Sequence, residues 1–285
     1  MITYPNIKIN LGLNVLRKRP DGYHDIETLF YPVHEIHDTL EIIAGDDFSR
    51  TSAEIFSKYG AEGENPMARQ GMTDDGKLII TVARKEGVDW DPLSDLCAKA
   101  YLLLDKEFQL PPVKIFLEKS SPVGAGLGGG SSDAAFTLKM LSDMFSLNLD
   151  EESLAAYASR LGSDCPFFIY NRPMLGKGRG EILSECSFSD ISGYELKVIS
   201  PEGIAVRTAE AYGGIKPHVP AISLEEAIQR PVEEWRTCLV NDFEKTVFPK
   251  HPELALIKQS LYDSGAVYAS MSGSGSSLFA LYPRM

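Results

Sequence analysis

Cysteine is scarce in this sequence of 285 residues: the four cysteines, at positions 97, 165, 186 and 238, are widely spaced and include no Cys-x-x-Cys pair. A disulfide framework or a zinc site would need closer or regularly spaced thiols, so we expect reduced, mostly buried cysteines in a cytoplasmic protein. Long apolar runs are also missing. None reaches the roughly 18 residues of a membrane-spanning helix, and the N-terminus has no signal-peptide pattern, so no membrane partner is expected.

Basic residues are in deficit as well, because 28 Lys and Arg stand against 40 Asp and Glu and give a net charge of −12. Nucleic acids and anionic membrane surfaces attract positive charge, so neither is expected as a main partner. A small anionic substrate is still compatible with this charge, since local cationic groups and backbone dipoles decide such binding. The remaining composition is ordinary for a soluble globular protein, and the length allows one large or two modest domains.

A glycine-rich segment, Pro122–Ala135, is the strongest feature that is present. It follows a predicted strand at 113–118 and leads into a helical pattern that continues to Phe145. Glycines let the backbone approach a ligand closely, and the free N–H groups of a helix N-terminus favour an anion. We therefore predict a phosphate-binding loop, with a turn that only starts a helix as the alternative; five glycines are more than such a turn needs.

Two common phosphate-loop patterns do not fit this segment. The pattern G-x-x-x-x-G-K-[ST] is absent, because no lysine follows any of the glycines. The dinucleotide fingerprint G-x-G-x-x-G matches Gly124, Gly126 and Gly129, but its acidic residue should end a second buried strand. The candidate acid, Asp150, instead fits the N-cap of a predicted helix over 151–161, so a Rossmann fold is not expected.

Residues 7–15 alternate between apolar and polar side chains, which predicts a strand with one buried face. The polar face carries Lys8 and Asn10, and it is either exposed to solvent or directs a cationic group into a cleft. Tyr23 and His24 follow a basic turn. Aromatic and imidazole groups in such a place either recognise a planar ligand or pack against their neighbours.

Asp164 lies in the sequence Gly162-Ser-Asp-Cys-Pro166, between a predicted helix and the apolar segment 167–170. Few of its sequence neighbours are polar. The side chain either caps a helix or serves as a catalytic carboxylate. Its combination with Lys8 and the predicted phosphate loop favours the catalytic interpretation.

The other periodicities predict strands interleaved with helices. The expected strands are 38–43, 78–83, 196–200, 267–271 and 277–282, and the expected helices are 91–104, 208–213, 223–229 and 253–264. We interpret 44–76 as a peripheral insertion or a hairpin region, and the basic segment 176–181 as an anion contact or a hairpin. A second Gly-Ser loop, Ser272–Ser276, is placed to meet the first across a cleft. These elements favour a two-domain α+β architecture.

Three segments together resemble the motifs of the GHMP small-molecule kinases: Lys8–Asn10, Pro122–Ala135 and Met271–Ser277. The resemblance spans the chain, and the order and spacing of its motifs are specific. It implies a two-domain GHMP kinase fold of the α+β class. An ATP-binding N-terminal domain, similar to domain 2 of ribosomal protein S5, would cover 1–158, and a ferredoxin-like C-terminal domain would cover 159–285.

Arg19–His24, the triple glycine 128–130 and Gly162–Pro166 resemble the branch of this family that acts on a cytidine diphosphate-linked methylerythritol. The resemblance implies transfer of the γ-phosphoryl group of ATP to the 2-hydroxyl of that substrate, in non-mevalonate isoprenoid biosynthesis. A kinase of mevalonate, homoserine or a sugar would not be expected to keep Asp-Gly-Tyr-His. A nucleotide-binding protein without turnover would need neither Lys8 nor Asp164.

The resemblance also implies a role for each site residue. Asp164 would accept the proton of the substrate hydroxyl, and Lys8 would orient and support it electrostatically. The substrate would contact Asn10, Tyr23, His24, Asp164, Thr208 and Tyr212, with the tyrosines stacking on the base and His24 at the cytosine edge. The ATP phosphates would contact Pro122, Val123, Gly124, Ala125, Gly126, Leu127, Gly128, Gly129, Gly130, Ser131 and Ser132, which we call the phosphate loop.

Magnesium and adenine contacts are less well defined by the resemblance. Mg²⁺ would bridge the ATP phosphates, but no acidic ligand is evident, which leaves the hydroxyl of Ser131 or Ser132 as a candidate. Ser94-Asp95-Leu96 stands where the family often has Asn-Leu, so adenine contacts near Asp95 are not assigned.

Overall fold

The computed structural model describes residues 1–45 and 67–284, and the chain forms two compact units. The first unit consists of Met1–Ile7, Val33–Ser121 and Gly129–Asn171, and the second of Lys8–Pro32, Pro122–Gly128 and Arg172–Met285. The chain therefore passes between the units several times, once inside the glycine-rich segment. The domain boundary at residue 158 stays a prediction.

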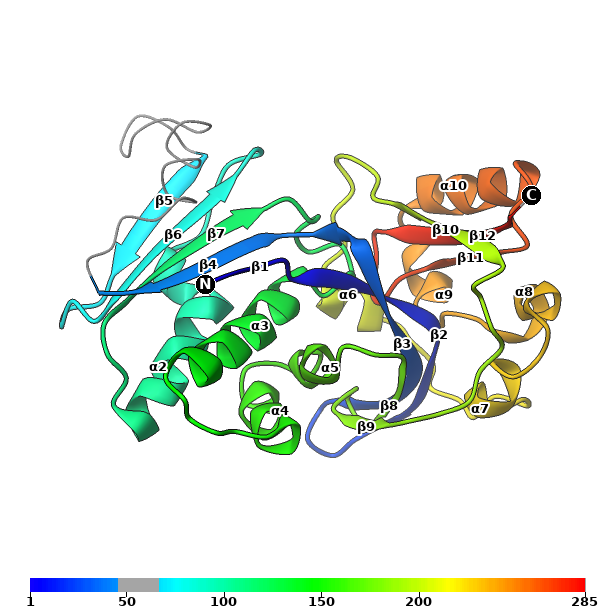
Figure 1. The fold of residues 1–285 in the computed structure, drawn as a ribbon. Coiled ribbons are helices and arrows are strands. Elements are labelled where there is room, and N and C mark those ends of the chain that lie inside the picture. Colours follow the sequence, from blue (N-terminus) through cyan, green and yellow to red (C-terminus); the bar gives the residue numbers. More distant parts are fainter. Residues whose placement is uncertain (46–66, 285) are drawn as a thin grey trace. The chain divides into compact units, whose positions relative to one another are not determined.

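The first unit contains a five-stranded sheet in the order β1-β4-β7-β6-β5, with a parallel β6–β7 pair and antiparallel pairs elsewhere. Its strands are β1 (Ile2–Thr3), β4 (Thr39–Ala44), β5 (Ala68–Met72), β6 (Leu78–Arg84) and β7 (Val113–Lys119). The helices α2 (Leu96–Phe108) and α3 (Gly129–Met144) pack side by side on one face of this sheet (Figure 1). The helices α4 (Glu151–Ser159) and α5 (Cys165–Tyr170) pack against α3.

The predicted helix start at Asp91 is wrong, because two capped segments replace one helix. Asp91 caps a short 3₁₀ turn, Pro92–Ser94, and accepts a hydrogen bond from the backbone N–H of Leu93 at 3.0 Å. Asp95 then caps α2 and accepts from Cys97 N–H at 2.9 Å. A proline in the first turn and an aspartate at the cap are favoured in both kinds of helix, so the sequence signal did not separate them.

The second unit contains most of a sheet in the order β2-β3-β8-β9 and a three-stranded antiparallel sheet in the order β10-β12-β11. The strands are β2 (Asn6–Lys18), β3 (His24–His37), β8 (Met174–Lys177), β9 (Ile182–Ser184), β10 (Tyr194–Ile199), β11 (Tyr268–Met271) and β12 (Leu278–Pro283). The helical segments are α6 (Thr208–Tyr212), α7 (Leu224–Ala227), η2 (Val232–Glu234), α8 (Trp235–Cys238), α9 (Glu244–Val247) and α10 (Pro252–Asp263). Segment 176–181 connects β8 to β9, so the hairpin interpretation is confirmed.

The core of the second unit joins β2 to the C-terminal sheet. Leu13 and Val15 of β2 are buried in one apolar cluster with Phe243, Ala269 and Met271. Burying such side chains contributes about 1.5–3 kcal/mol each for the larger ones, so this cluster holds the strand that carries Lys8 firmly in the unit.

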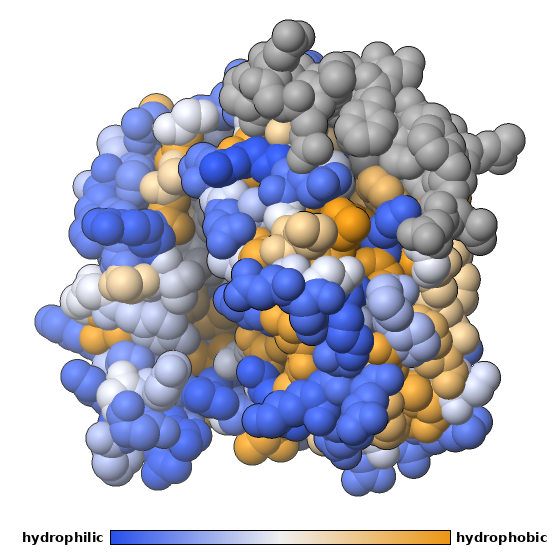
Figure 2. All heavy atoms as spheres, turned by 90° about the vertical axis from the view of Figure 1, so that its left-hand side faces the viewer, coloured by the Kyte–Doolittle hydropathy of each residue, from blue (hydrophilic) through white to orange (hydrophobic). Residues whose placement is uncertain are grey.

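The surface combines polar and apolar residues. In Figure 2, hydrophilic side chains are interleaved with smaller apolar areas on one face of the molecule. Within residues 1–45 and 67–284, no helix is long and apolar enough to cross a membrane. Residues 46–66 of the predicted insertion 44–76 lie outside the described residues, and the part that is described includes β5.

Candidate active site

The strand β2 is buried on both faces, so the prediction of a half-buried strand is wrong, and so is the solvent-exposed alternative for its polar face. Ile7, Ile9 and Leu11 are fully buried, and Lys8 and Asn10 on the opposite face are only 2% exposed. An alternating sequence predicts one solvated face only when nothing covers that face. Here other segments of the same unit cover it, including the first half of the phosphate loop.

Lys8 joins β2 to the phosphate loop. Its ammonium nitrogen Nζ donates to the carbonyl oxygen of Gly126 at 2.9 Å and to Asn10 Oδ1 at 2.6 Å, and its backbone N–H donates to Leu127 O at 2.9 Å. Asn10 is oriented in turn by Thr28, whose hydroxyl accepts from Asn10 Nδ2 at 3.0 Å. A buried ammonium group needs such oxygen partners, because burial without them costs several kcal/mol.

Thr28 was not found from the sequence. Its hydroxyl also donates to the carbonyl oxygen of Gly12 at 2.5 Å, so it links β3 to two positions of β2. The apolar and polar residues of 26–33 would have indicated a strand, but no motif marks a single threonine within it. Only the pairing of β2 with β3 makes Thr28 a neighbour of Asn10.

The two glycine-rich loops touch directly. Ser272 Oγ donates to Gly126 O at 3.0 Å, and Ser277 N–H donates to Ala125 O at 3.1 Å. Gly126 has φ +79°, and a Cβ atom there would lie 2.2 Å from the carbonyl oxygen of Ser272. Only glycine fits this approach. The predicted meeting of the loops is therefore a backbone contact, within the second unit.

The helix α3 begins inside the glycine triplet, at Gly129. A Cβ atom at this position would lie 2.6 Å from Ser121 Oγ, so the helix start is pressed against the end of β7. The N–H groups of the first helical turn have no partners within a helix, and the helix dipole is positive there. Residues 129–132 therefore form a helix N-terminus of the kind that favours an anion, and phosphate binding there stays a prediction.

Asp164 lies in the same unit as α3, immediately before α5. It occupies the N-cap position, but its side chain makes no capping hydrogen bond, so the capping interpretation is wrong. The following thiol, Cys165, is fully buried, and burial raises its pKa to about 12, with a hydrogen bond to Ser131 acting in the opposite direction. Cys165 is thus a neutral thiol that links the Asp164 segment to the first turn of α3.

His24 and Tyr212 form a stacked pair, with ring centroids 4.8 Å apart and ring planes at 21°. Tyr212 is packed edge-on against Phe243 as well. Tyr23 is 56% exposed, and its ring lies under the guanidinium group of Arg179 at 4.9 Å. Burial, and then the charge of Lys18, lower the pKa of His24 below 6.5, so the imidazole is neutral at pH 7.

Thr208 begins α6 and lies beside the second Gly-Ser loop. Its hydroxyl is 3.4 Å from that of Ser274, and Tyr212 ends the same short helix. The second unit thus brings together two groups of predicted residues: Lys8 and Asn10 with the phosphate loop, and His24 with Tyr212. Their roles, and those of Asp164 and Tyr23, stay predictions.

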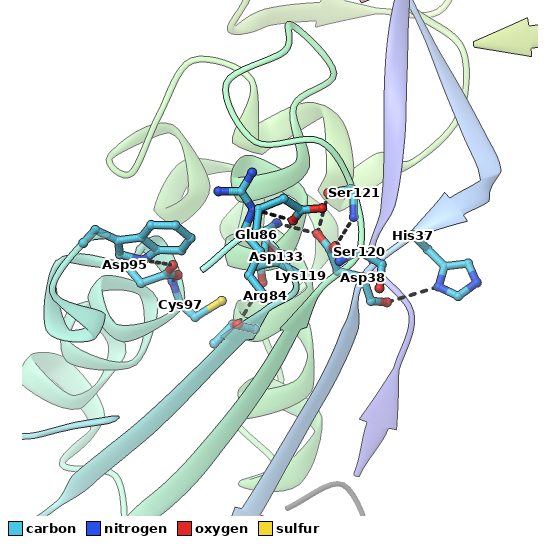
Figure 3. Close-up of polar contacts among 12 residues, drawn as sticks. His37, Asp38, Arg84, Glu86, Asp95, Cys97, Lys119, Ser120, Ser121 and Asp133 are labelled. Atoms are coloured by element: carbon cyan, nitrogen blue, oxygen red, sulfur yellow. Dashed lines mark hydrogen bonds and ion pairs between the residues drawn. The ribbon is translucent and has the colours of Figure 1, made fainter. Parts of the chain in front are cut away.

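A buried ion network, which sequence reasoning missed, supports α3 (Figure 3). The Lys119 ammonium group donates to Asp133 Oδ2 at 2.5 Å and also pairs with Asp38. Asp38 accepts further hydrogen bonds from the N–H groups of Ser120 and Ser121, at 2.6 and 2.7 Å, and from the Ser121 hydroxyl at 2.7 Å. The network joins the start of β4, the end of β7 and the second turn of α3.

The charges in this network are almost completely buried. Burial by itself lowers the pKa of Lys119, but the two carboxylates outweigh it and raise the pKa, so the ammonium stays charged. Burial also raises the pKa of Asp133, which shares the single cation with Asp38. In the described part of the chain, Ser132 Oγ and Asp133 Oδ1 are buried without a hydrogen-bond partner.

Within the described residues, neither Asp95 nor any cluster of histidine and acidic side chains forms a metal site. Trp90 Nε1 donates to Asp95 Oδ2 at 3.2 Å, so both oxygens of this carboxylate serve the start of α2. Across residues 1–45 and 67–284, no group of three or more His, Cys, Asp or Glu side chains could hold a metal ion.

Two family models match the chain: GHMP kinases N terminal domain over residues 95–172 and GHMP kinases C terminal over residues 223–284. The first match includes the phosphate loop, α3 and Asp164, and the second includes the second Gly-Ser loop. The fold and the loops therefore define a small-molecule kinase of the GHMP class, as predicted.

Relatives give a narrower assignment. The chain is 48% identical over 282 residues to the 4-diphosphocytidyl-2-C-methyl-D-erythritol kinase of Bacteroides fragilis, covering 99% of this chain and 92% of the relative. It is 50% identical to the kinase of the same name from Bacteroides thetaiotaomicron, with the same coverage. A crystal structure of 4-(cytidine 5'-diphospho)-2C-methyl-D-erythritol kinase superposes with a TM-score of 0.73 at 28% identity, covering 99% of this chain and 90% of the other. The chain belongs to the 4-diphosphocytidyl-2-C-methyl-D-erythritol kinase family of GHMP kinases, and the predicted α+β fold is confirmed.

We expect Lys119→Met to lower the free energy of unfolding by about 3–5 kcal/mol, because it leaves two buried carboxylates without their cation. The double variant Lys119→Met/Asp133→Asn removes one of these charges and should recover part of the loss. Urea denaturation followed by tryptophan fluorescence measures both. A loss below about 1 kcal/mol would mean that the network behaves like an exposed ion pair.

We expect NMR titration to give His24 a pKa below 6.5. Between that pKa and the unfolded value the unfolded chain binds more protons, so this histidine makes stability fall as pH drops through the window. His24→Gln should remove that part of the pH dependence while leaving stability at pH 8 nearly unchanged. A measured pKa at or above the ordinary value would contradict the burial argument.

Proposed function

We propose that the protein transfers the γ-phosphoryl group of ATP to the 2-hydroxyl of 4-diphosphocytidyl-2-C-methyl-D-erythritol, a step of non-mevalonate isoprenoid biosynthesis. One observation carries the proposal: the buried ammonium group of Lys8 is bonded to the carbonyl of Gly126 inside the phosphate loop. A lysine held in that place serves phosphoryl transfer, which depends on positioning and on electrostatic stabilisation. The names of the Bacteroides relatives supply the acceptor alcohol.

Asp164 is the proposed general base. It would accept the proton of the 2-hydroxyl as the oxygen attacks the γ-phosphorus, and Lys8 would support the carboxylate and the developing charge. The packing of α5 against α3 supports this role, since the proposed base and the N-terminus of α3 belong to one unit.

ATP would be held by its phosphates on residues 122–132, through backbone N–H groups and the dipole of α3. Mg²⁺, when bound, would neutralise phosphate charge. The donor set fits a hard cation that keeps water and phosphate ligands, because Ser131 and Ser132 offer hydroxyl oxygens and Ser132 Oγ has no partner within the described residues. These hydroxyls would hold the cation together with the nucleotide.

The cytidine end of the substrate would be recognised around His24. The neutral imidazole can both donate and accept a hydrogen bond, which suits the edge of a cytosine base. Tyr23 and Tyr212 would stack on the base, and Asn10 and Thr208 would contact the remainder of the substrate. The stacked His24–Tyr212 pair supports an aromatic site here, and the cation over Tyr23 adds a positive group suited to an anionic substrate.

A coupled ADP-release assay across candidate alcohols tests the acceptor. With Mg-ATP, we expect turnover of the cytidyl substrate and none above background with mevalonate, homoserine or galactose. The product should carry the new phosphate on the 2-oxygen, which ³¹P NMR identifies. Inertness toward the cytidyl substrate with turnover of another alcohol would replace the proposed acceptor. ATP binding without any turnover would favour a non-catalytic nucleotide-binding protein.

Asp164→Asn should lower kcat by about 100-fold or more, because general base catalysis contributes roughly that much. The dissociation constant for ATP, measured by calorimetry, should change little. Asp150→Asn is the matched control, since asparagine caps a helix as well as aspartate does and Asp150 caps α4. Near-normal turnover in Asp164→Asn would remove this residue as the base. The expected cytoplasmic location stays a prediction.

A further inference from the structure

Asn241 is a fully buried amide that holds the second Gly-Ser loop. It is 1% exposed, and its Nδ2 atom donates to two backbone carbonyls, Met271 O at 2.7 Å and Gly273 O at 2.8 Å. Its Oδ1 atom accepts from the N–H of Phe243 at 3.0 Å. Both amide hydrogens thus bond to the loop and the end of β11, while the amide oxygen accepts from the segment that carries Asn241.

The loop held in this way is the one that contacts the phosphate loop. Between Met271 and Gly273 lies Ser272, whose hydroxyl donates to Gly126 O, the same carbonyl that accepts from Lys8. A Cβ atom at Gly273 would lie 2.9 Å from Gly126 O. A shift of this loop toward the phosphate loop therefore meets Gly126 directly, because the backbones are already in close contact.

The segment that carries Asn241 is itself attached to β2. Leu13 N–H donates to Val240 O and Asp242 N–H donates to Leu13 O, both at 2.8 Å, in a parallel bridge. The carboxylate of Asp242 accepts from the N–H of Val15 at 2.8 Å. Since β2 also carries Lys8, residues 240–242 connect this strand to the second Gly-Ser loop.

The chemistry of the position suits asparagine. Two carbonyl oxygens require two donors on one short side chain, and a backbone N–H requires an acceptor beside them. An aspartate would place a carboxylate against two carbonyl oxygens, and a serine would supply only one donor. Glutamine carries the same amide one methylene further out, at a position that is only 1% exposed.

We propose that Asn241 is a positioning residue of the ATP-phosphate site. It fixes the carbonyls of Met271 and Gly273 and thereby holds the Ser272 hydroxyl on Gly126 O. Because Lys8 donates to the same carbonyl, this contact helps to keep the phosphate loop in its conformation. The inference rests on the proposed role of the phosphate loop in ATP binding. Asn241 does not touch substrate, and it acts through the second Gly-Ser loop.

The test is Asn241→Ala in the full chain, with Tyr268→Phe as matched control. Tyr268 is also buried, and its hydroxyl donates to Leu239 O at 3.0 Å and is hydrogen-bonded to Ser270, and both of these partners lie outside the two loops. Both variants lose buried hydrogen bonds in the same region. We expect Asn241→Ala, but not Tyr268→Phe, to raise the dissociation constant for ATP or to lower kcat by about 10- to 100-fold. A small misplacement of groups in a site usually costs this much. The KM for the cytidyl substrate should stay within about twofold.

Two measurements separate positioning from stability. Calorimetric titration with ATP reports binding without turnover, and it is made at a temperature where circular dichroism shows both variants fully folded. An unchanged ATP dissociation constant together with unchanged kcat in Asn241→Ala overturns the proposal, and so does an equal loss in Tyr268→Phe. If wild-type protein binds ATP but does not phosphorylate the cytidyl substrate, the proposed acceptor fails, while the ATP titration still decides the role of Asn241.

If Asn241→Ala does not yield folded protein, Ser272→Ala tests the next contact in the same chain of hydrogen bonds. This variant removes only the hydroxyl on Gly126 O. A weaker ATP affinity in Ser272→Ala with an unchanged KM for the cytidyl substrate supports the proposal. An unchanged ATP affinity and kcat overturns it.

Discussion

The contact between the Lys8 ammonium group and the carbonyl of Gly126 is the interaction on which the second unit depends. A cation in a buried strand is costly unless oxygen atoms surround it, and Asn10 and Gly126 supply them. The same requirement fixes the phosphate loop, because its backbone must stay within reach of the lysine. Thr28 orients Asn10, and Ser272 shares the Gly126 carbonyl. The proposed binding site and the fold of this unit thus depend on one set of hydrogen bonds.

The first unit also contains a buried lysine, but its ammonium group is stabilised in a different way. Its buried cation, Lys119, has two carboxylate partners instead of neutral oxygens, and Asp38 is further satisfied by two backbone N–H groups. Such networks fix one arrangement of the elements that contribute to them, because any other arrangement would separate buried charges. The helix start at Gly129 is held in this way, with the Asp164 segment packed on the same helix. Each half of the glycine-rich segment therefore has its own buried lysine as an anchor.

The sequence predicted most strands and helices, the glycine-rich turn that leads into α3, and the family, since these depend on local periodicity or on continuous motifs. It did not predict that β2 is buried on both faces, because covering segments lie far away in the chain. The roles of Asn241 and Thr28 were not predicted for the same reason: the partners of a single polar residue are known only once the strand or loop that folds against it is known. The helix start moved from Asp91 to Asp95 because both aspartates offer the same capping signal. Long-range pairing therefore accounts for the burial of β2 and for the roles of Asn241 and Thr28, whereas the helix start reflects two equal local signals.

The close approach of Gly126 to the carbonyl of Ser272 also has an evolutionary consequence. No side chain fits at residue 126 while the loop at 272–275 keeps its path, and that loop cannot retreat while Asn241 holds its carbonyls. A substitution at any one of these three places is therefore opposed by the other two, although residue 126 lies more than a hundred residues before both of the others. Divergence in this part of the protein requires paired changes, so these segments are expected to vary together or not at all.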